Sequence, residues 1–231
     1  MKVAELILYE DNHLLVLNKP GGLLTQGDRT GDPTLLSWAK EYLKVKYKKP
    51  GRVFLGLVHR LDRVTSGVVI LARTSKAAAR LSAAFRERRV KKGYLALVHG
   101  AVSPAQGFFE DSIAWKAAQR KAFLDPRGRQ ARLYFQVLEK RKSESLLFLA
   151  PESGRKHQIR VQLAARGHPI VGDWKYGSRR KIREGRAILL HAWWIDFPHP
   201  TRKERLHLWA PLPYYWPHNL KLKPPTFEFF P

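Results

Sequence analysis

Short apolar runs separated by polar turns open the chain. Residues 6–9 and 14–17 are apolar and are split by Glu10-Asp11-Asn12, a pattern that predicts two strands joined by a turn. Residues 35–47 carry apolar side chains at helical spacing instead, and Lys48-Lys49-Pro50-Gly51 ends that spacing. We therefore predict a strand pair followed by one amphipathic helix.

The rest of the chain continues as strands interrupted by helices. Residues 68–72 form a compact β-branched run, and Thr74 or Ser75 can cap a following helix that carries an apolar stripe. Another helix is expected from His157 to Arg166, before Gly167. Further strands are expected at residues 93–98, 133–138, 146–149, 188–195 and 206–209.

These elements predict an α+β fold with a mixed, largely antiparallel central sheet and flanking helices. No internal repeat, low-complexity linker or abrupt change of composition divides the sequence. We expect residues 1–231 to form a single domain of two lobes that share one sheet, with residues 221–231 as a possible C-terminal tail.

The charge balance indicates the kind of partner. The 231 residues include 43 Lys and Arg but 19 Asp and Glu, a formal net charge of +24 that far exceeds what solubility requires. Nucleic acid is the leading candidate, because each phosphate that a cation neutralises releases counterions. The alternative is a protein that is merely basic.

Two further features restrict the chemistry and the location. Cysteine is absent, which excludes disulfides, thiolate catalysis and thiolate metal sites. No pair among the nine histidines has the short helical spacing of a zinc site, and we predict neither a metal nor a cofactor. The first residues contain no apolar stretch long enough for a signal peptide or a membrane span, so we expect a cytoplasmic protein without a membrane partner.

In one loop of the sequence, a carboxylate is flanked by two arginines. The loop reads His59-Arg60-Leu61-Asp62-Arg63, and Thr65-Ser66-Gly67 follows. Nearby guanidinium charge favours the ionised form of Asp62 and keeps it available as a nucleophile at neutral pH. The alternative is an ion-paired loop aspartate with a structural role. A likeness to the protein-kinase catalytic loop fails, because the sequence has neither a glycine-rich phosphate loop nor Asp-Phe-Gly.

A second polar cluster leads into the helix expected after His157. It reads Gly154-Arg155-Lys156-His157-Gln158-Ile159-Arg160. Arginine suits a bidentate clamp on a carboxylate or a phosphate, which makes Arg160 a candidate partner for an acid. A basic surface patch is the alternative explanation.

Seven short motifs occur in order along nearly the whole chain. They are Glu10-Asp11 with residues 14–23, His59-Arg60-Leu61-Asp62 with Thr65-Ser66-Gly67, residues 92–100, Gly154-Arg155 with residues 157–161, residues 167–173 with Tyr176-Gly177, Leu190-His191-Ala192, and Ala210-Pro211-Leu212. In this order and spacing they resemble the RluA family of RNA pseudouridine synthases. The resemblance implies the pseudouridine synthase catalytic fold and the isomerisation of specific uridines in structured RNA, either ribosomal or transfer RNA.

The resemblance also implies catalytic roles. Asp62 matches the family nucleophile, and Arg160 matches the arginine that pairs with the catalytic carboxylate. Tyr94 matches the tyrosine that stacks on the target base and is proposed to help remove the C5 proton, although an ordinary strand aromatic would look the same. Whether the carboxylate adds to C1′ or promotes glycal formation stays open.

Further residues are expected to bind the substrate. Leu190 matches an apolar residue packed against the site, although a core leucine would look identical. The full substrate-binding set is His59, Arg60, Arg155, His157, Gln158 and Leu190.

Two basic runs flank the site motifs and are expected to contact RNA phosphates. They are Arg86, Arg88, Arg89, Lys91 and Lys92 before Tyr94, and Arg179, Arg180 and Lys181 after Gly177. A solvated charged face is the alternative. The S4 RNA-binding domain of many relatives is missing from this sequence, so we expect the catalytic body to hold the RNA by itself, as a monomer.

Two other functions compete with this interpretation. A non-catalytic RNA-binding or ribosome-assembly protein with the same fold would be expected to lack one of the three catalytic residues, and all three are present. A nucleobase-releasing glycosidase would need a second, water-activating carboxylate. No second acid for this role is evident except Asp173, which is expected to be structural.

Overall fold

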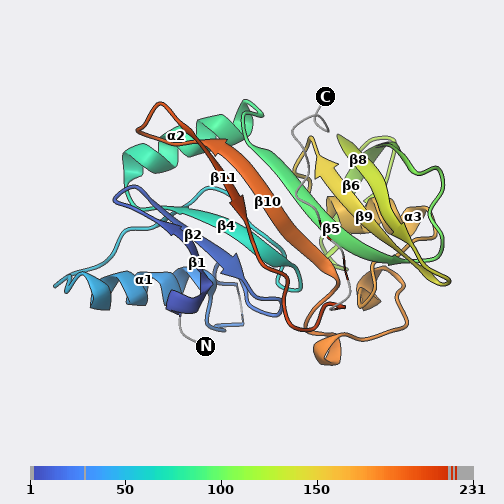
Figure 1. The fold of residues 1–231 in the computed structure, drawn as a ribbon, viewed down its shortest axis with the longest axis horizontal. Helices are drawn as coiled ribbons and strands as arrows, with labels where there is room; N and C mark the ends of the chain where they lie inside the picture. Colours follow the sequence, from blue (N-terminus) through green and yellow to red (C-terminus); the bar gives the residue numbers. More distant parts are fainter. Residues whose placement is uncertain (1–2, 29, 218–219, 221, 223–231) are drawn as a thin grey trace.

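One large sheet forms the centre of the molecule (Figure 1). The computed structural model describes residues 3–28, 30–217, 220 and 222. The strands run in the order β1-β2-β4-β10-β5-β9-β8-β6-β7, with β3 paired to β4 and β11 paired to β10. Their bounds are β1 Ile7–Glu10, β2 Leu14–Lys19, β3 Gly56–Leu57, β4 Ser66–Ala72, β5 Lys91–His99, β6 Gln106–Lys116, β7 Lys121–Leu124, β8 Arg129–Lys140, β9 Glu144–Pro151, β10 Leu190–Pro198 and β11 Arg205–Trp209.

Helices flank this sheet within the described residues. The α-helices are α1 Leu35–Lys46, α2 Ser75–Arg86 and α3 Gln158–Ala165, and the short 3-10 helices are η1 Val3–Leu6, η2 Trp174–Tyr176 and η3 Arg183–Gly185. Between named strands, β4 pairs with β10 in parallel and the other pairings are antiparallel. The predicted α+β fold with a mixed, largely antiparallel sheet is therefore confirmed.

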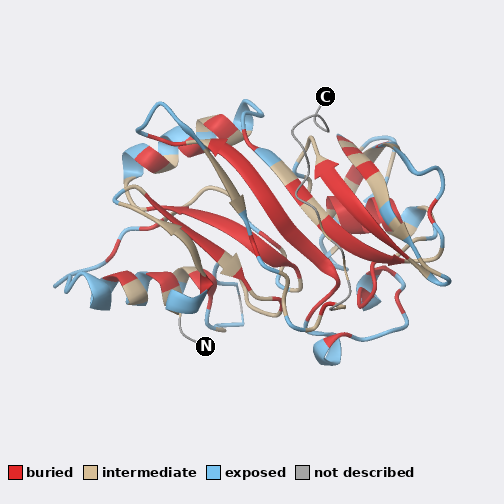
Figure 2. Cartoon of the chain, in the orientation of Figure 1, coloured by how far each residue is buried: buried red, intermediate tan, exposed pale blue. Residues whose placement is uncertain are grey.

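The apolar runs of β2 and β4 are continuous because both faces of these strands are covered. Leu15 and Leu17 pack in one cluster with the α1 residues Leu35 and Leu43. The alternate residues of β2 pack in another cluster with Leu81 of α2. Since neighbouring side chains of a strand point to opposite faces, α1 and α2 cover opposite sides of the sheet (Figure 1). Figure 2 shows β4 and β10 buried along nearly their whole length.

A threonine caps the N-terminus of each of the first two α-helices. Thr34 caps α1, and its hydroxyl and that of Ser37 each accept from the other residue's backbone N–H. Thr74 caps α2 by accepting from the backbone N–H of Ala77. The expected cap at Thr74 or Ser75 is thus confirmed at Thr74.

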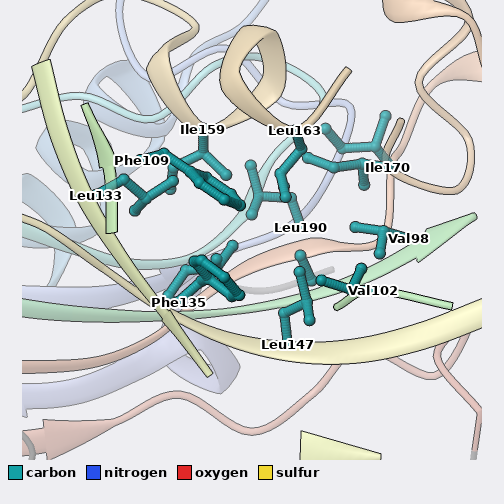
Figure 3. Packing of buried hydrophobic residues seen from close by; sticks show 13 residues of the cluster. Val98, Val102, Phe109, Leu133, Phe135, Leu147, Ile159, Leu163, Ile170 and Leu190 are labelled. Carbon is teal, nitrogen blue, oxygen red and sulfur yellow. The ribbon is translucent and has the colours of Figure 1, made fainter. Parts of the chain in front are cut away.

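Helix α3 covers the other half of the sheet (Figure 3). Ile159 and Leu163 point from α3 toward Leu133 of β8 and Leu147 of β9, in a cluster that also holds Leu190. This packing fixes one side of a short helix and so fixes the direction of the side chains between its apolar positions.

Three strands were not expected from the sequence: the two-residue strand β3, and the edge strands β6 and β7. β6 and β7 lie at the edge of the sheet beyond β8, and most β6 residues are partly or fully exposed. The adjacent pairs Phe108-Phe109 and Glu110-Asp111 break the alternation that would indicate a strand. The tail expected at 221–231 lies outside the described residues apart from Leu222. No helix in the described ranges has the length and apolar character needed to cross a bilayer.

Candidate active site

Asp62 lies in the loop between β3 and β4, where two packing clusters meet. Leu61, just before it, belongs to the cluster around α1, β2 and β4. Val64, two residues after it, packs against the cluster around α3, β5 and β9. The loop is therefore anchored in both, and 27% of the Asp62 side chain remains exposed between them.

Backbone and hydroxyl hydrogen bonds hold the shape of this loop. The N–H of Thr65 donates to the carbonyl of Asp62 at 3.1 Å, which closes a tight turn. The hydroxyl of Thr25 donates to the carbonyl of Leu61 at 2.8 Å. The N–H of Gly22 donates to the carbonyl of Arg63 at 2.8 Å. Both ends of the turn are thus tied to the segment that follows β2.

A buried lysine completes this attachment. Lys19 is fully buried, and its ammonium donates to the carbonyls of Pro20 at 3.0 Å, Leu23 at 2.8 Å and Arg63 at 3.2 Å. Burial lowers the pKa of Lys19 to about 7, and the charges of Asp62 and Arg63 act on it in opposite directions. Lys19 therefore holds the loop through three backbone carbonyls rather than through an ion pair with a carboxylate.

The glycine after this loop lets β4 approach β10 closely. Gly67 has φ +118°, and a Cβ built there would lie 2.2 Å from the carbonyl oxygen of Ala192. Next to it, the hydroxyl of Ser66 bonds Nδ1 of His191 at 2.8 Å. No side chain fits at Gly67, so the Ser66-Gly67 pair sets the spacing between the two parallel strands.

Arg160 links two carboxylates at the end of this loop. Its Nη1 donates to Oδ2 of Asp62 at 2.9 Å. Its Nε and Nη2 donate to Oδ2 and Oδ1 of Asp173 at 2.7 and 2.8 Å. Only 5% of the Arg160 side chain and 1% of the Asp173 side chain are exposed, so Asp62 is the carboxylate that an entering molecule can reach.

The guanidinium keeps its charge despite its burial. Burial would lower the pKa of Arg160, but the hydrogen bonds and charge of Asp173, together with Asp62, outweigh this and raise it. Asp62 therefore faces a permanent positive charge held in a fixed plane.

His157 approaches Asp62 from the start of α3. Its Nε2 lies 3.6 Å from Oδ2 of Asp62, and its Nδ1 lies 2.9 Å from the hydroxyl of Tyr176. Burial lowers the pKa of His157 to about 4, so the ring is neutral at neutral pH and the contact with Asp62 is not an ion pair. The Tyr176 oxygen already accepts from the N–H of Ala122 at 2.8 Å. Its hydroxyl proton can go to Nδ1 of His157 at 2.9 Å or to the Ala122 carbonyl at 3.4 Å, and Nδ1 is the nearer acceptor. Nε2 then carries the proton and points at the carboxylate.

Tyr94 lies on β5 and packs against both clusters that flank the Asp62 loop. Burial raises the pKa of its phenol, and the negative charge of Asp62 raises it further. The ring is therefore neutral and lies within the electrostatic reach of the carboxylate. Together these side chains form a carboxylate site with the fixed cation of Arg160, the neutral imidazole of His157 and the phenol of Tyr94.

A model of the RNA pseudouridylate synthase family matches residues 13–165, more than half of the chain. The chain belongs to this family. This RNA pseudouridine synthase is an isomerase that converts uridine in RNA to pseudouridine, and the reaction and the RluA-type relationship expected from the motifs are confirmed.

Named relatives cover nearly all of the synthase. Ribosomal large subunit pseudouridine synthase C of Buchnera aphidicola subsp. Schizaphis graminum is 37% identical over 224 residues, which are 93% of this chain and 69% of that protein. Dual-specificity RNA pseudouridine synthase RluA of Escherichia coli is 34% identical over 211 residues, 89% of this chain and 92% of that protein. The solved structure of human RNA Pseudouridylate Synthase Domain Containing 4 superposes with a TM-score of 0.77 at 28% identity, and the match covers 92% of this chain and 90% of that one.

The expected substrate-binding residues of the synthase fall into two groups. Arg60 is exposed beside the carboxylate loop, and His157 faces Asp62. His59 instead accepts from the N–H of Ile70 at 2.9 Å and stacks on Phe85 at 4.8 Å between ring centroids. Burial lowers its pKa to about 3, with a further contribution from the charge of Lys92.

The other three expected residues are held by the protein itself. Gln158 accepts from Ser153 and from the N–H of Arg155, which fixes the loop before α3. The guanidinium of Arg155 donates to the carbonyl of Gln130 at 3.1 Å. Leu190 is 3% exposed and lies in the core beneath α3.

The two expected RNA-binding runs are mostly at the surface. Arg86, Arg88, Arg89, Lys91, Arg179, Arg180 and Lys181 are exposed. Arg89 pairs with Glu87 at 2.8 Å and Arg180 with Glu144 at 3.2 Å. Lys92 differs, because burial lowers the pKa of its ammonium to about 8.

Two residues of the site were not assigned to it from the sequence. Asp173 was expected to be structural, and Tyr176 was noted only as part of a motif, yet they hold Arg160 and His157. The sequence signal that could have identified them is their place in the motif of residues 167–177. Asp173 lies 13 residues after Arg160 in the sequence. No group of three or more His, Asp or Glu within the described residues could hold a metal ion.

Proposed function

We propose that Asp62 is the catalytic carboxylate that acts on the target uridine in the RNA. The observation that carries the proposal is a difference in solvent exposure. Arg160 and Asp173 are buried, whereas Asp62 is partly exposed and receives one fixed hydrogen bond from Arg160. A carboxylate in this setting is accessible and held in one orientation, as a nucleophile or base needs to be.

The reaction breaks the N1–C1′ glycosidic bond and forms a C5–C1′ bond. The uracil loses the proton at C5 and gains one at N1, so nothing is oxidised and no co-substrate is consumed. Asp62 acts on the ribose, either by adding to C1′ or by removing a sugar proton to give a glycal. Its fixed salt bridge with Arg160 and the N–H of His157 stabilise the carboxylate when it is released again.

Tyr94 is proposed to hold the uracil while the glycosidic bond is broken. Its ring is partly accessible, neutral and close enough for the Asp62 charge to act on its phenol. An aromatic face can retain a base without fixing its rotation, which suits a base that must turn before C5 bonds to C1′. Its hydroxyl is the candidate group for removal of the C5 proton.

The substrate is proposed to be ribosomal RNA of the large subunit. Relatives at 34–38% identity include several that are named large subunit pseudouridine synthases. We also propose that the enzyme works as a monomer, because the acid, its two partners and the phenol all come from one chain. We propose the cytoplasm as its location, since relatives are named for acting on ribosomal RNA.

The test is release of tritium from C5-labelled uridine in a large-subunit ribosomal RNA transcript. Wild-type protein should release one tritium per modified uridine, and Asp62→Asn, which keeps the shape of the side chain, should release none above background. Asp32→Asn is the matched control, since Asp32 is a partly exposed acid that pairs with Arg63 one residue after Asp62. Equal release by the wild-type and Asp62→Asn proteins would exclude the assignment.

A further inference from the structure

The turn around η2 directs its side chains in two directions. Asp173 and Tyr176 are buried and form hydrogen bonds within the catalytic network. Trp174 and Lys175, which lie between them in the sequence, face the solvent. The Trp174 residue is 64% exposed. An anchored turn thus carries a free indole next to the active site.

An indole exposed to this degree is unusual, because tryptophan is highly buried on average and exposed apolar surface commonly marks a binding site. The mechanism assigns no role to Trp174, and its ring makes no contribution to the core clusters of the described residues. Its side chain is therefore available to a partner.

The groups around this indole are cations. The ammonium of Lys181 lies 5.3 Å from the Trp174 ring centroid. Lys175 donates to the carbonyl of Arg120 at 3.1 Å, and Arg179 is exposed two residues after Gly177. An apolar protein partner would have to desolvate these charges, which is costly. A single strand of nucleic acid offers a base for the indole and phosphates for the cations.

The position of Lys175 ties this surface to the catalytic centre. Burial lowers the pKa of its ammonium, the charges of Arg160 and Arg120 lower it further, and those of Asp173 and Asp62 raise it. The ammonium therefore lies within the field of the carboxylate that acts on the uridine.

We propose that Trp174 is a stacking platform for an unpaired base of the RNA close to the target uridine, with Lys175 and Lys181 on the phosphates of the same strand. The proposal rests on the proposed function, since it needs a uridine bound at Asp62. Because Asp173 and Tyr176 fix the turn from inside, the indole is pre-organised and loses little freedom when a base stacks on it.

The test measures binding without turnover, with a single-stranded oligouridylate and with the duplex that it forms with oligoadenylate. Trp174→Ala should weaken binding of the single strand about tenfold, as expected for the loss of one stacked base. Trp174→Phe, which keeps a smaller aromatic face, should lose less. The duplex has no unpaired base, so its affinity should be the same for all three proteins.

Phe54→Ala is the matched control, because Phe54 is 52% exposed and lies in the segment before β3, by the C-terminal end of β4 rather than by the Asp62 loop. It should bind both probes as the wild type does. Equal affinity of the wild-type and Trp174→Ala proteins for the single strand would overturn the proposal, and so would an equal loss for strand and duplex. Neither result depends on tritium release, so failure of the Asp62 assignment would be recognised separately.

Discussion

Asp173 occupies Nε and Nη2 of Arg160 and leaves Nη1 for Asp62. The buried acid therefore fixes the plane of the guanidinium, and the accessible acid receives the remaining donor in one direction. The Asp173 side chain is 1% exposed, so we expect any effect that it has on the reaction to pass through Arg160.

Replacing Asp173 with Asn should impair both folding and activity. The variant keeps the size of the side chain but leaves the buried charge of Arg160 with one acidic partner, and breaking such a pair costs about 3–5 kcal/mol of unfolding free energy. The freed guanidinium no longer holds Asp62, so kcat should fall at least about tenfold. Urea unfolding followed by circular dichroism and tritium release measure the two effects. Glu87→Gln, which breaks an exposed pair with Arg89, should change stability by less than about 1 kcal/mol; similar losses in both variants would contradict this prediction.

Gly67→Ala should prevent stable folding. The added Cβ would lie 2.2 Å from the Ala192 carbonyl oxygen, and φ +118° is a conformation that alanine rarely adopts. We expect a loss of more than about 3 kcal/mol, because β4 would have to move away from β10. Gly154→Ala is the control, since a Cβ there meets nothing within 4 Å. Equal midpoints of thermal unfolding for the two variants would refute the steric argument.

Acid should destabilise the protein through its buried histidines. Burial lowers the pKa of His191 to about 4, and its neutral ring bonds Ser66 and the carbonyl of Ala210. Between pH 6.5 and 4 the unfolded chain binds a proton that folded His191 does not, so stability present above pH 6.5 is lost as the pH falls to about 4, roughly 3 kcal/mol in total. The lowered pKa values of His59 and His157 act in the same direction.

Urea unfolding at several pH values measures this slope. In His191→Gln the slope between pH 6.5 and 4 should decrease by up to about 1.4 kcal/mol per pH unit, which corresponds to one proton. Parallel curves for the two proteins would show that His191 takes up its proton in the folded state as readily as in the unfolded one.

The basic segment after η2 should contribute to RNA affinity through salt-dependent contacts. Replacing Arg179, Arg180 and Lys181 with alanine should weaken binding and reduce the slope of log affinity against log salt by up to about 2 to 3, since each phosphate contact contributes about 0.7–0.9. The control replaces Lys44, Lys49 and Arg52, which are exposed near the C-terminal end of α1, far from η2 (Figure 1). An unchanged slope in the first variant, or an equal reduction in both, would mean that this segment does not contact phosphates.

The sequence was informative where local pattern and packing agree. The continuous apolar runs of β2 and β4 exist because helices cover both faces, and Thr74 before α2 is one of the two caps that the pattern indicated. The cap of α1 at Thr34 was not predicted. Strands β6 and β7 could not be recognised in this way, because few of their residues are buried: β6 buries Phe109 and Ile113, and β7 buries Ala122. At the sheet edge, β6 pairs with β8 and β7 pairs with β6.

The site was predictable in its residue types but not in its connections. Motif resemblance gave Asp62 and Arg160, and the structure brings them within 2.9 Å across 98 residues of sequence. The sequence could not distinguish His157, which faces the carboxylate, from His59, which stacks on Phe85, because both are histidines in motifs. Such a distinction depends on long-range packing that no local spacing reports.

The anchoring of the Asp62 loop in two clusters also makes the carboxylate sensitive to how the halves of the sheet are aligned. Leu61 and Val64 hold the loop to different cores, whereas Arg160 moves with α3 alone. A small shift between β4 and β10 would separate Asp62 from Arg160 while preserving almost all secondary structure. Catalysis is thus a stricter reporter of correct assembly in this enzyme than helix or strand content.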